Sequence, residues 1–343
     1  MKLLLYANFK ETAIGAMFET AAVSLGWQLE KVDIRNSLSR FGILNRVYWH
    51  CFDHGRPRLA RIAKELLRKN REFCPDLVIF SGISPFSLEV LRQLKSDSGA
   101  VLCVYLTDDP WNPCHRTRRF FDNITGYDCI FTTKHILEDD LLKAGARMVK
   151  YLPFAYDPAR HYPVTPSAGE MKRYGCDVAY VGGGDRDRIR DFEPLLRDPG
   201  ISLRLYGGYW DKFPETRKFA CGMLDAASYR LAVACAKVNI VNGRRANRDQ
   251  HAMRSFEIPA MSGACVVEDT QEHREIFGDD ESCVLYYRTP VELAAAAKRM
   301  IGDEQLRQRL RDNLAKRFAE CDFTYSGRLR EISAVLEKER ADV

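Results

Sequence analysis

Two polar segments in the second half of the chain carry residue types and spacings suited to binding a phosphate and a sugar. The first, VGGGDRDR at residues 181–188, lies between a predicted strand and a predicted helix. Glycine lets a backbone approach phosphate oxygens, a helix start offers free N–H groups, and arginine chelates phosphate. The segment therefore predicts a diphosphate site formed by Gly182, Gly183, Gly184, Arg186 and Arg188.

A plain flexible turn with solvated charges explains the same glycines about equally well when the segment is considered alone. A dinucleotide-binding fingerprint does not fit, because Gly182 and Gly184 are not followed by the third glycine and Asp187 stands in its place.

The second segment, from Asn247 to Gly263, is a polar loop that enters a predicted helix. Arg254 and Glu257 are three residues apart, so they lie on one face of that helix. A carboxylate accepts hydrogen bonds from sugar hydroxyls, and a guanidinium donates to phosphate, so the pair suits both parts of a nucleotide. A capped surface helix with an ion pair is the alternative, and the residues alone favour it.

Composition indicates a globular protein of two domains, because 343 residues with 46% apolar content exceed the usual size of one core. The 52 basic and 47 acidic residues are interspersed, which predicts no nucleic-acid surface and at most peripheral membrane contact. Eleven cysteines, without paired metal-ligand spacing, favour a reducing cytoplasm and no metal site. The opening MKLLLYANF is expected to form a strand, not a signal sequence.

Apolar runs alternate with amphipathic segments in both halves, which predicts an α/β fold with two parallel sheets covered by helices. Strands are expected at residues 3–6, 29–33, 77–80, 101–106, 129–132, 148–151, 177–181, 202–206, 238–241, 264–267 and 283–286. Residues 153–175 contain four prolines and no helical period, so they are interpreted as a linker. Ligands of such sheets bind beyond the carboxyl ends of the strands, where both polar segments lie.

The run AKVNIVNGRRANRDQHAMRSFEIPAMSGACVVED strongly resembles glycosyltransferases related to the CgeB spore-maturation proteins, in which D-x-H-x-x-R-x-F-E-x-P-A-x-x-G recurs. VAYVGGGDRDRIRDFEPLL, VYLTDDPWN and FTYSGRLREI extend a weaker resemblance over most of the chain. The resemblance implies the GT-B fold, with two Rossmann-like doubly wound domains and an interdomain cleft. It implies an acceptor-side domain at residues 1–155, a nucleotide-sugar-binding domain at 156–322, and a C-terminal helix at 323–343 that returns to the first domain.

The same resemblance assigns roles around the donor. Glu257 matches the glutamate that binds the ribose hydroxyls in these and the broader family-4-type retaining enzymes. Asp249 stands where the first glutamate of their Glu-x7-Glu signature is usual, which leaves its role and the stereochemistry open. His251 is expected at the phosphate or sugar, as a catalytic residue, although a buried structural histidine is the competing interpretation. Tyr209 is expected near the base, although core packing is common for the adjacent Trp210.

Residues of the first half are expected on the acceptor side. Asn8, Lys10 and Gly15 follow the first predicted strand, and Asp108 and Asp109 follow a central one. We predict no metal at the two aspartates, because neighbouring side chains on an extended segment point apart and GT-B enzymes characteristically work without one. One aspartate is expected to cap the next turn and the other to contact acceptor or sugar, and capping alone is equally favoured.

These observations predict transfer of a sugar from a UDP- or GDP-linked donor to an unidentified glycan, lipid-linked sugar, protein or small molecule, without a cofactor. Arg188, Arg254, His251 and loop N–H groups would stabilise the leaving diphosphate. Asp108 or Asp109 would be the base if the reaction inverts, and the diphosphate itself would be the base if it retains. The alternatives are a nucleotide-sugar epimerase or hydrolase of the same fold, and a non-catalytic nucleotide-sugar-binding protein.

Overall fold

The computed structural model describes residues 1–341, which form two compact units. Unit 1 comprises Met1–Pro153, Ala246–Arg248 and the chain from Tyr325 on, and unit 2 comprises Phe154–Arg245 and Asp249–Thr324. A short piece of the second half of the sequence therefore belongs to unit 1. The last two residues of the predicted returning segment, 342 and 343, lie outside the described residues.

The strands of unit 1 form one parallel sheet in the order β2-β1-β3-β4-β5-β6. The order reverses between β1 and β3, so the loops after these strands lie at a topological switch point. The strands are β1 Lys2–Ala7, β2 Gln28–Asp33, β3 Leu77–Ser81, β4 Val101–Leu106, β5 Cys129–Thr132 and β6 Val149–Tyr151. The helices are α1 Ile14–Ser24, α2 Gly42–Cys51, α3 Leu59–Phe73, α4 Leu88–Ser98, α5 Arg118–Asp122, α6 Glu138–Lys143 and α14 Tyr325–Ala341.

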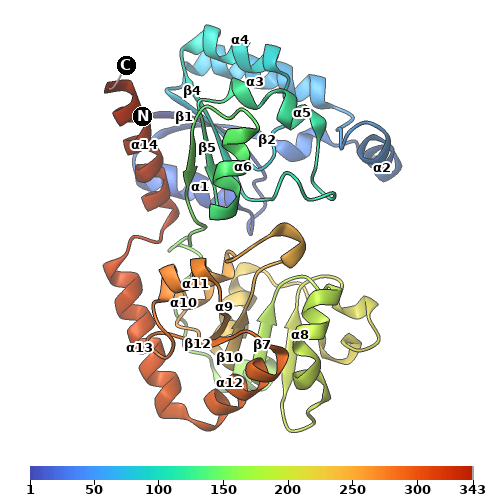
Figure 1. Ribbon diagram of the computed structural model, residues 1–343, viewed down its shortest axis with the longest axis vertical. Helices are drawn as coiled ribbons and strands as arrows, with labels where there is room; N and C mark the ends of the chain where they lie inside the picture. The colour runs from blue at the N-terminus through green and yellow to red at the C-terminus, as the bar shows by residue number, and fades with distance from the viewer. Residues whose placement is uncertain (342–343) are drawn as a thin grey trace. The chain divides into compact units, whose positions relative to one another are not determined.

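Helices cover both faces of this sheet, because successive side chains of a strand point in opposite directions. Val104 of β4 joins the core beneath α3 and α4. Its neighbour Tyr105 contacts Phe18 of α1 on the opposite face, with ring centroids 5.1 Å apart. Phe18 also contacts Tyr325 of α14 at 5.0 Å, so α14 packs beside α1 (Figure 1).

Unit 2 contains a second parallel sheet in the order β12-β11-β10-β7-β8-β9. This is the strand order of a Rossmann sheet, with its switch point between β7 and β10. The strands are β7 Cys176–Val181, β8 Leu203–Tyr206, β9 Ala220–Gly222, β10 Ala236–Val241, β11 Cys265–Glu268 and β12 Leu285–Tyr287. The helices are α7 Ala168–Tyr174, α8 Arg186–Arg197, α9 Ala226–Ala234, α10 Arg254–Ala260, α11 Gln271–Phe277, α12 Pro290–Gly302 and α13 Glu304–Glu320.

Two apolar cores flank the second sheet. Val178 and Tyr180 of β7 pack with α8, α12 and α13 on one face. Ala179, between them in sequence, packs with α7 and α9 on the other face. The predicted fold class, two parallel Rossmann-like sheets each covered by helices, is therefore confirmed.

The structure corrects the interpretation of residues 153–175 as a linker without a helix. Helix α7 begins after Ser167, whose side chain accepts a hydrogen bond from the Glu170 backbone while Glu170 bonds back to Ser167. This capping box stabilises a helix of only seven residues, too short to show a clear apolar period beside the prolines. Strand β9 was also missed, because it has three residues and ends in glycine.

The chain turns sharply after α10, and this turn yields a stability prediction. A Cβ at Gly263 would lie 2.5 Å from Ile258 Cγ2 and 2.7 Å from Val233 Cγ1, whereas one at Gly302 would meet nothing within 4 Å. Because forced overpacking usually costs about 1–3 kcal/mol, we expect Gly263→Ala to lower the free energy of unfolding by that amount in urea titrations. The control, Gly302→Ala, should unfold at the same urea concentration as the parent or slightly above it. Equal midpoints for both variants would contradict the prediction.

Candidate functional site

The two loops at the switch point of unit 2 are joined by one buried guanidinium. Arg188, at 4% exposure, donates to the Gly183 carbonyl at 3.0 Å and to Asp185 Oδ2 at 2.8 Å in the loop after β7. It also reaches Asn242 Oδ1 at 3.4 Å and the Gly243 carbonyl at 3.5 Å after β10. These four hydrogen bonds mean that Arg188 chiefly connects the loops.

The three glycines after β7 serve different purposes. A Cβ at Gly182 would lie 2.6 Å from Tyr180 Oη, and one at Gly184 would lie 2.9 Å from the Trp210 ring. These two glycines therefore allow close packing, and Trp210 Nε1 donates to the Gly182 carbonyl at 2.8 Å. At Gly183 the nearest atoms are 3.9 Å away, so this is the position with space for a ligand.

The exposed side of this loop is formed by Tyr209 and Arg186. Tyr209 is 59% exposed and has a φ of 75°, a left-handed conformation that strains a non-glycine residue. A Cβ at Gly183 would be 3.9 Å from its ring, so the tyrosine stands beside the open glycine. Arg186 pairs with Glu215 at 3.2 Å and lies over the Phe213 ring at 4.9 Å.

Glu257, near the start of α10, is a buried carboxylate with two donors directed at it. The Tyr229 hydroxyl donates to Glu257 Oε2 at 3.0 Å, and His161 Nε2 lies 3.7 Å from Oε1. Burial, together with the carboxylate, raises the pKa of Tyr229 well above its ordinary value, so the hydroxyl keeps its proton. Burial lowers the pKa of His161 although Glu257 acts to raise it. At neutral pH the carboxylate thus meets uncharged partners.

Arg254, one turn before Glu257, is half-buried. Burial acts against its charge, but Tyr180, Glu257 and Tyr229 outweigh that effect and raise the pKa of Arg254. Among residues 1–341 its guanidinium makes no hydrogen bond and no ion pair, so the surface ion pair considered as an alternative does not form. A half-buried arginine without a partner is a ready anion site.

His251 is 1% exposed, and both of its ring nitrogens contact the protein. Nδ1 lies 2.6 Å from Glu272 Oε2, and Nε2 accepts a hydrogen bond from the Phe154 backbone N–H at 3.2 Å. An Nε2 that accepts places the proton on Nδ1, which donates to Glu272. This geometry favours the structural alternative for His251 over direct contact with a donor.

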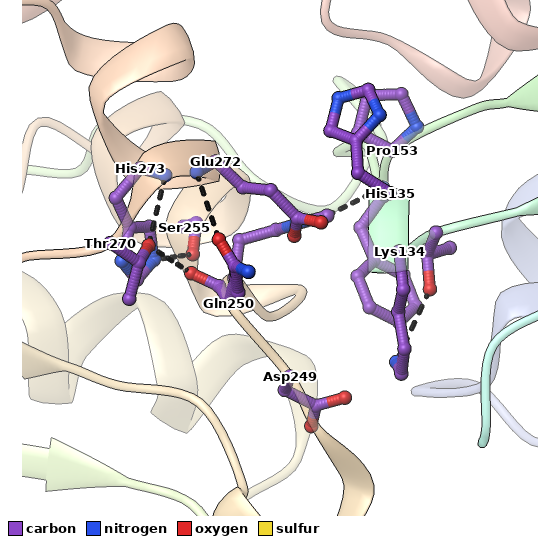
Figure 2. Close-up of polar contacts among 12 residues, drawn as sticks. Lys134, His135, Pro153, Asp249, Gln250, Ser255, Thr270, Glu272 and His273 are labelled. Atoms are coloured by element: carbon purple, nitrogen blue, oxygen red, sulfur yellow. Dashed lines mark hydrogen bonds and ion pairs between the residues drawn. The ribbon is translucent and has the colours of Figure 1, made fainter. Parts of the chain in front are cut away.

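The loop before α10 is bound to the start of α11 (Figure 2). The Thr270 hydroxyl donates to the Gln250 carbonyl at 2.5 Å, and the Glu272 N–H donates to Gln250 Oε1 at 3.5 Å. Ser255 Oγ lies 2.9 Å from His273 Nε2. The position of Arg254 and Glu257 is therefore determined by buried side chains of the next helix.

Asp249 closes the loop that precedes it. Its backbone N–H donates to the Arg244 carbonyl at 3.2 Å, and its Oδ2 accepts from the Arg244 N–H at 3.3 Å. A Cβ at Gly243 would lie 2.2 Å from the Asp249 carbonyl oxygen, which explains the glycine. The residues between, Ala246–Arg248, belong to unit 1.

In unit 1 the two neighbouring aspartates differ in environment. Asp109 is 3% exposed, accepts from the Trp111 N–H at 2.9 Å and from Arg248 Nε at 2.6 Å, and its backbone N–H donates to Asn247 Oδ1 at 2.8 Å. It caps a turn and neutralises an arginine. The Asp108 side chain is 37% exposed and lies 3.6 Å from His115 Nε2, so it is the more accessible carboxylate.

The loop after β1 lies at the switch point of unit 1. Asn8 Oδ1 accepts from the Lys10 N–H at 3.1 Å, while the Lys10 side chain is exposed. A Cβ at Gly15 would lie 2.4 Å from the Asn8 carbonyl oxygen, so Gly15 lets α1 approach the end of β1.

Lys134 follows β5 and is 1% exposed. Its side-chain amine donates a hydrogen bond to the Thr107 carbonyl at 2.9 Å.

Sequence reasoning missed several residues that complete these sites. Tyr229 and His161 support Glu257, Arg248 pairs with Asp109, and Lys134 is buried at a strand end. Arg248 stands next to Asp249 in the motif, and Lys134 follows the predicted strand at residues 129–132, so the sequence offered a signal for both. No sequence signal marked Tyr229 and His161, because only the folding of the chain brings them close to Glu257.

Within residues 1–341, no group of three or more histidine, cysteine, aspartate or glutamate side chains is arranged to bind a metal ion. None of the helices in the described part of the chain combines the length and apolar character needed to cross a bilayer.

Comparison with known proteins adds to this geometry. Residues 188–334 match a family model described as glycosyl transferase-like. The matched region contains Arg188, Tyr229, Arg254 and Glu257. No curated protein matches the chain by sequence.

Solved structures resemble the whole chain. Sucrose-phosphate synthase from Thermosynechococcus elongatus is 14% identical with a TM-score of 0.65, each chain being covered completely. HepE from Anabaena, in complex with UDP and glucose, is 11% identical with a TM-score of 0.66 over 98% of this chain and 100% of its own. A candidate UDP-N-acetylglucosamine 2-epimerase from Listeria monocytogenes is 11% identical with a TM-score of 0.56 over 100% and 97%. These likenesses show the two-domain Rossmann-like fold of GT-B proteins.

The buried histidines beneath α10 predict a loss of stability in acid. Burial, with a contribution from His251, lowers the pKa of His273 to about 3, whereas an unfolded histidine titrates near ~6.5. As the pH falls, the unfolded chain therefore binds a proton at this histidine before the folded chain does. The stability contributed by neutral His273 is fully present above about pH 6.5 and is lost as the pH falls toward 3, at about 1.4 kcal/mol per pH unit.

We expect His273→Asn to reduce the dependence of unfolding free energy on pH by up to about one proton in this window. Urea titrations between neutral pH and the onset of acid unfolding measure it. The exposed His50→Asn is the matched control and should keep the slope of the parent. Parallel curves for the parent and His273→Asn would show that His273 is protonated in the folded protein.

Proposed function

We propose that this chain is a glycosyltransferase that takes a sugar from a nucleoside diphosphate donor, with UDP as the first nucleotide to test. The proposal is carried by two residues at the start of α10. Glu257 is a buried carboxylate, and Arg254 is a guanidinium that makes no ion pair among residues 1–341. Both lie in the region that matches the glycosyl transferase-like model. The UDP bound to HepE supports the choice of nucleotide.

Glu257 is proposed to bind the ribose. Tyr229 occupies one acceptor position of the carboxylate, and two oxygens offer about four such positions. The free positions suit two adjacent hydroxyl groups. Arg254, whose charge is unpaired by the protein, would then lie next to the phosphates of the same nucleotide.

The loop after β7 is proposed to receive the diphosphate, with Gly183 as its open position. Helix α8 adds the favourable field of its N-terminus. Arg188 acts as a positioning residue here, because its hydrogen bonds are made to both loops. Tyr209, exposed beside Gly183, is proposed to contact the nucleotide, and Asp249 to keep the adjoining loop closed.

The reaction proposed needs charge stabilisation more than covalent catalysis. The bond between the sugar and the phosphate oxygen breaks, the diphosphate leaves with the electron pair, and the acceptor oxygen bonds to the sugar. The proton of the acceptor hydroxyl passes to Asp108 if the reaction inverts, or to the leaving diphosphate if it retains. A fixed guanidinium such as Arg254 stabilises the charge that develops on the leaving oxygen. Asp108 is the more accessible of the two aspartates and is proposed to act on the acceptor side with Asn8 and Lys10.

The finer assignments remain part of the proposal. We propose a hexosyl donor, catalysis without a bound metal or cofactor, membership of the CgeB-like group, and a cytoplasmic location. Eleven free cysteines support the reducing compartment.

A nucleotide-sugar epimerase or hydrolase is the second candidate, because the Listeria protein has the same fold. Such an enzyme converts a UDP-sugar when no acceptor is present. Incubation with UDP-glucose or UDP-N-acetylglucosamine alone, followed by analysis of the sugar, separates it from a transferase.

Substitutions of Glu257 test the proposed ribose contact. A charged hydrogen bond to a ligand is worth about 1.5–3 kcal/mol, so Glu257→Ala should weaken binding of UDP by roughly ten- to a hundredfold. Glu257→Gln keeps the shape and should lose less. Calorimetric titration with UDP and with uridine measures both, and each variant should lose a similar factor for the two ligands.

Two further variants serve as controls for this titration. Arg254→Met should weaken UDP far more than uridine, because only UDP carries the phosphates. Glu193→Ala removes an exposed carboxylate that pairs with Arg197 on α8 and should bind both ligands as the parent does. If folded Glu257→Ala binds UDP with the affinity of the parent, the donor site is elsewhere.

A further prediction concerns metal. We expect transfer, once a donor and acceptor are identified, to continue in EDTA at a rate close to that measured without EDTA, because arginine supplies the charge that a metal would provide. Loss of turnover in EDTA that magnesium or manganese restores would contradict this and would direct attention to Asp108.

A further inference from the structure

Unit 1 exposes a group of large apolar side chains on α2 and at its two ends, termed here the α2 surface. None of the side chains of α2 is buried. Phe41 is 68% exposed, Ile43 72% and Phe52 56%. The members of the α2 surface are Phe41, Ile43, Leu44, Val47, Trp49 and Phe52. In Figure 1 the helix stands at the outer side of unit 1, away from the strands.

The same stretch of chain is strongly basic. Residues 34–64 contain seven basic residues and a single acidic one, Asp53. The basic residues are Arg35, Arg40, Arg46, Arg56, Arg58, Arg61 and Lys64. Of these, Arg35 pairs with Asp33, just before this stretch, at 2.6 Å. Arg40 and Arg46, which flank the exposed apolar side chains, are exposed and make no ion pair among residues 1–341.

Asp53, the single acidic residue of this stretch, has a structural role. Asp53 accepts hydrogen bonds from the Thr117 hydroxyl at 2.7 Å and from the backbone of Arg118 and Arg119 at 2.9 and 3.0 Å. These contacts lower the pKa of Asp53 although partial burial acts to raise it. The Asp53 carboxylate is therefore taken up by hydrogen bonds to the start of α5.

A hollow of about 680 Å³ adjoins this surface between α2, α3 and α4. Its walls combine aromatic and aliphatic groups, among them Tyr48, Phe52 and Phe86, with three cations, Arg56, Lys64 and Arg119, and one carboxylate, Glu89. The hollow therefore continues the apolar contact area of the α2 surface and has an excess of basic over acidic residues.

We propose that the α2 surface binds the face of a lipid bilayer that carries anionic headgroups. An amphipathic helix that presents large apolar groups together with arginines enters the boundary between headgroups and acyl chains. The arginines gain from the negative potential of the lipid surface, within a distance set by salt. This contact is peripheral, and it requires no ligand at the sites of unit 2.

Charge argues against one other occupant of the α2 surface, and the exposed apolar groups argue against another. A second copy of the chain would bring an equally basic surface against this one, and like charges facing each other oppose association. Nucleic acid would match the arginines, but the exposed aliphatic groups Ile43, Leu44 and Val47 gain nothing from a phosphate backbone. An anionic bilayer satisfies both the apolar and the cationic groups.

Flotation with lipid vesicles tests the proposal on the full chain without nucleotide, so its outcome is separate from that of the donor-site experiments. The parent should float with vesicles of phosphatidylcholine containing phosphatidylglycerol and remain behind with phosphatidylcholine alone. Phe41→Ser with Ile43→Ser, and separately Arg40→Glu with Arg46→Glu, should each weaken binding roughly tenfold or more. Added salt should weaken binding of the parent.

Matched controls come from unit 2. Val291 and Met223 are 73% and 78% exposed, so Val291→Ser with Met223→Ser removes a similar apolar area elsewhere and should bind as the parent does. Circular dichroism checks that each variant folds, which is expected because α2 buries no side chain. The proposal is overturned if the parent binds no vesicles, if both vesicle types bind equally, or if α2 variants float like the parent. Self-association that the Phe41 and Ile43 changes abolish, without vesicle binding, would also overturn it in favour of a second copy.

Discussion

A buried guanidinium must find acceptors for its N–H groups, and Arg188 finds them on two separate loops. The carbonyls of Gly183 and Gly243 and the side-chain oxygen of Asn242 all face it. The ends of β7 and β10 are therefore connected by one charge at the point where the strand order reverses. Because Asp185 both caps α8 and accepts from this guanidinium, the start of the helix is fixed by the same contact. The open position at Gly183 follows from that arrangement.

The sheets were predictable because buried parallel strands are continuous apolar runs, and β5 was placed at residues 129–132 from the sequence alone. Helix α7 was not predictable, since its stability comes from a capping box that outweighs weak local propensity. At the site, Glu257 and Arg254 were predictable because their spacing on one helix is local. Tyr229 and His161 were not, since one comes from α9 and the other from the proline-rich segment, and only tertiary packing brings them to Glu257.

The motif D-x-H-x-x-R-x-F-E combines residues of different physical roles. His251 bonds to Glu272 and to the backbone of Phe154, and its ring packs against Phe256 at 5.6 Å. These contacts are buried and serve the positioning of α10. Arg254 and Glu257 in the same motif retain capacity for a ligand. A recurring pattern marks both kinds of residue alike, so the hydrogen bonds of the folded chain are needed to separate them.

The distinction between positioning residues and ligand-binding residues matters most for Arg254 and Glu257, the two charged residues of α10. Had Arg254 and Glu257 paired with each other, each would have neutralised the group that a nucleotide needs. Instead, Tyr229 and His161 approach Glu257 with uncharged donors, which keep the carboxylate in place and leave the guanidinium unpaired. Burial opposes the charge of Arg254, but the surrounding groups outweigh burial and raise its pKa, so the guanidinium stays charged in the empty protein. A charge that is already in position requires no reorganisation when the leaving group becomes more negative.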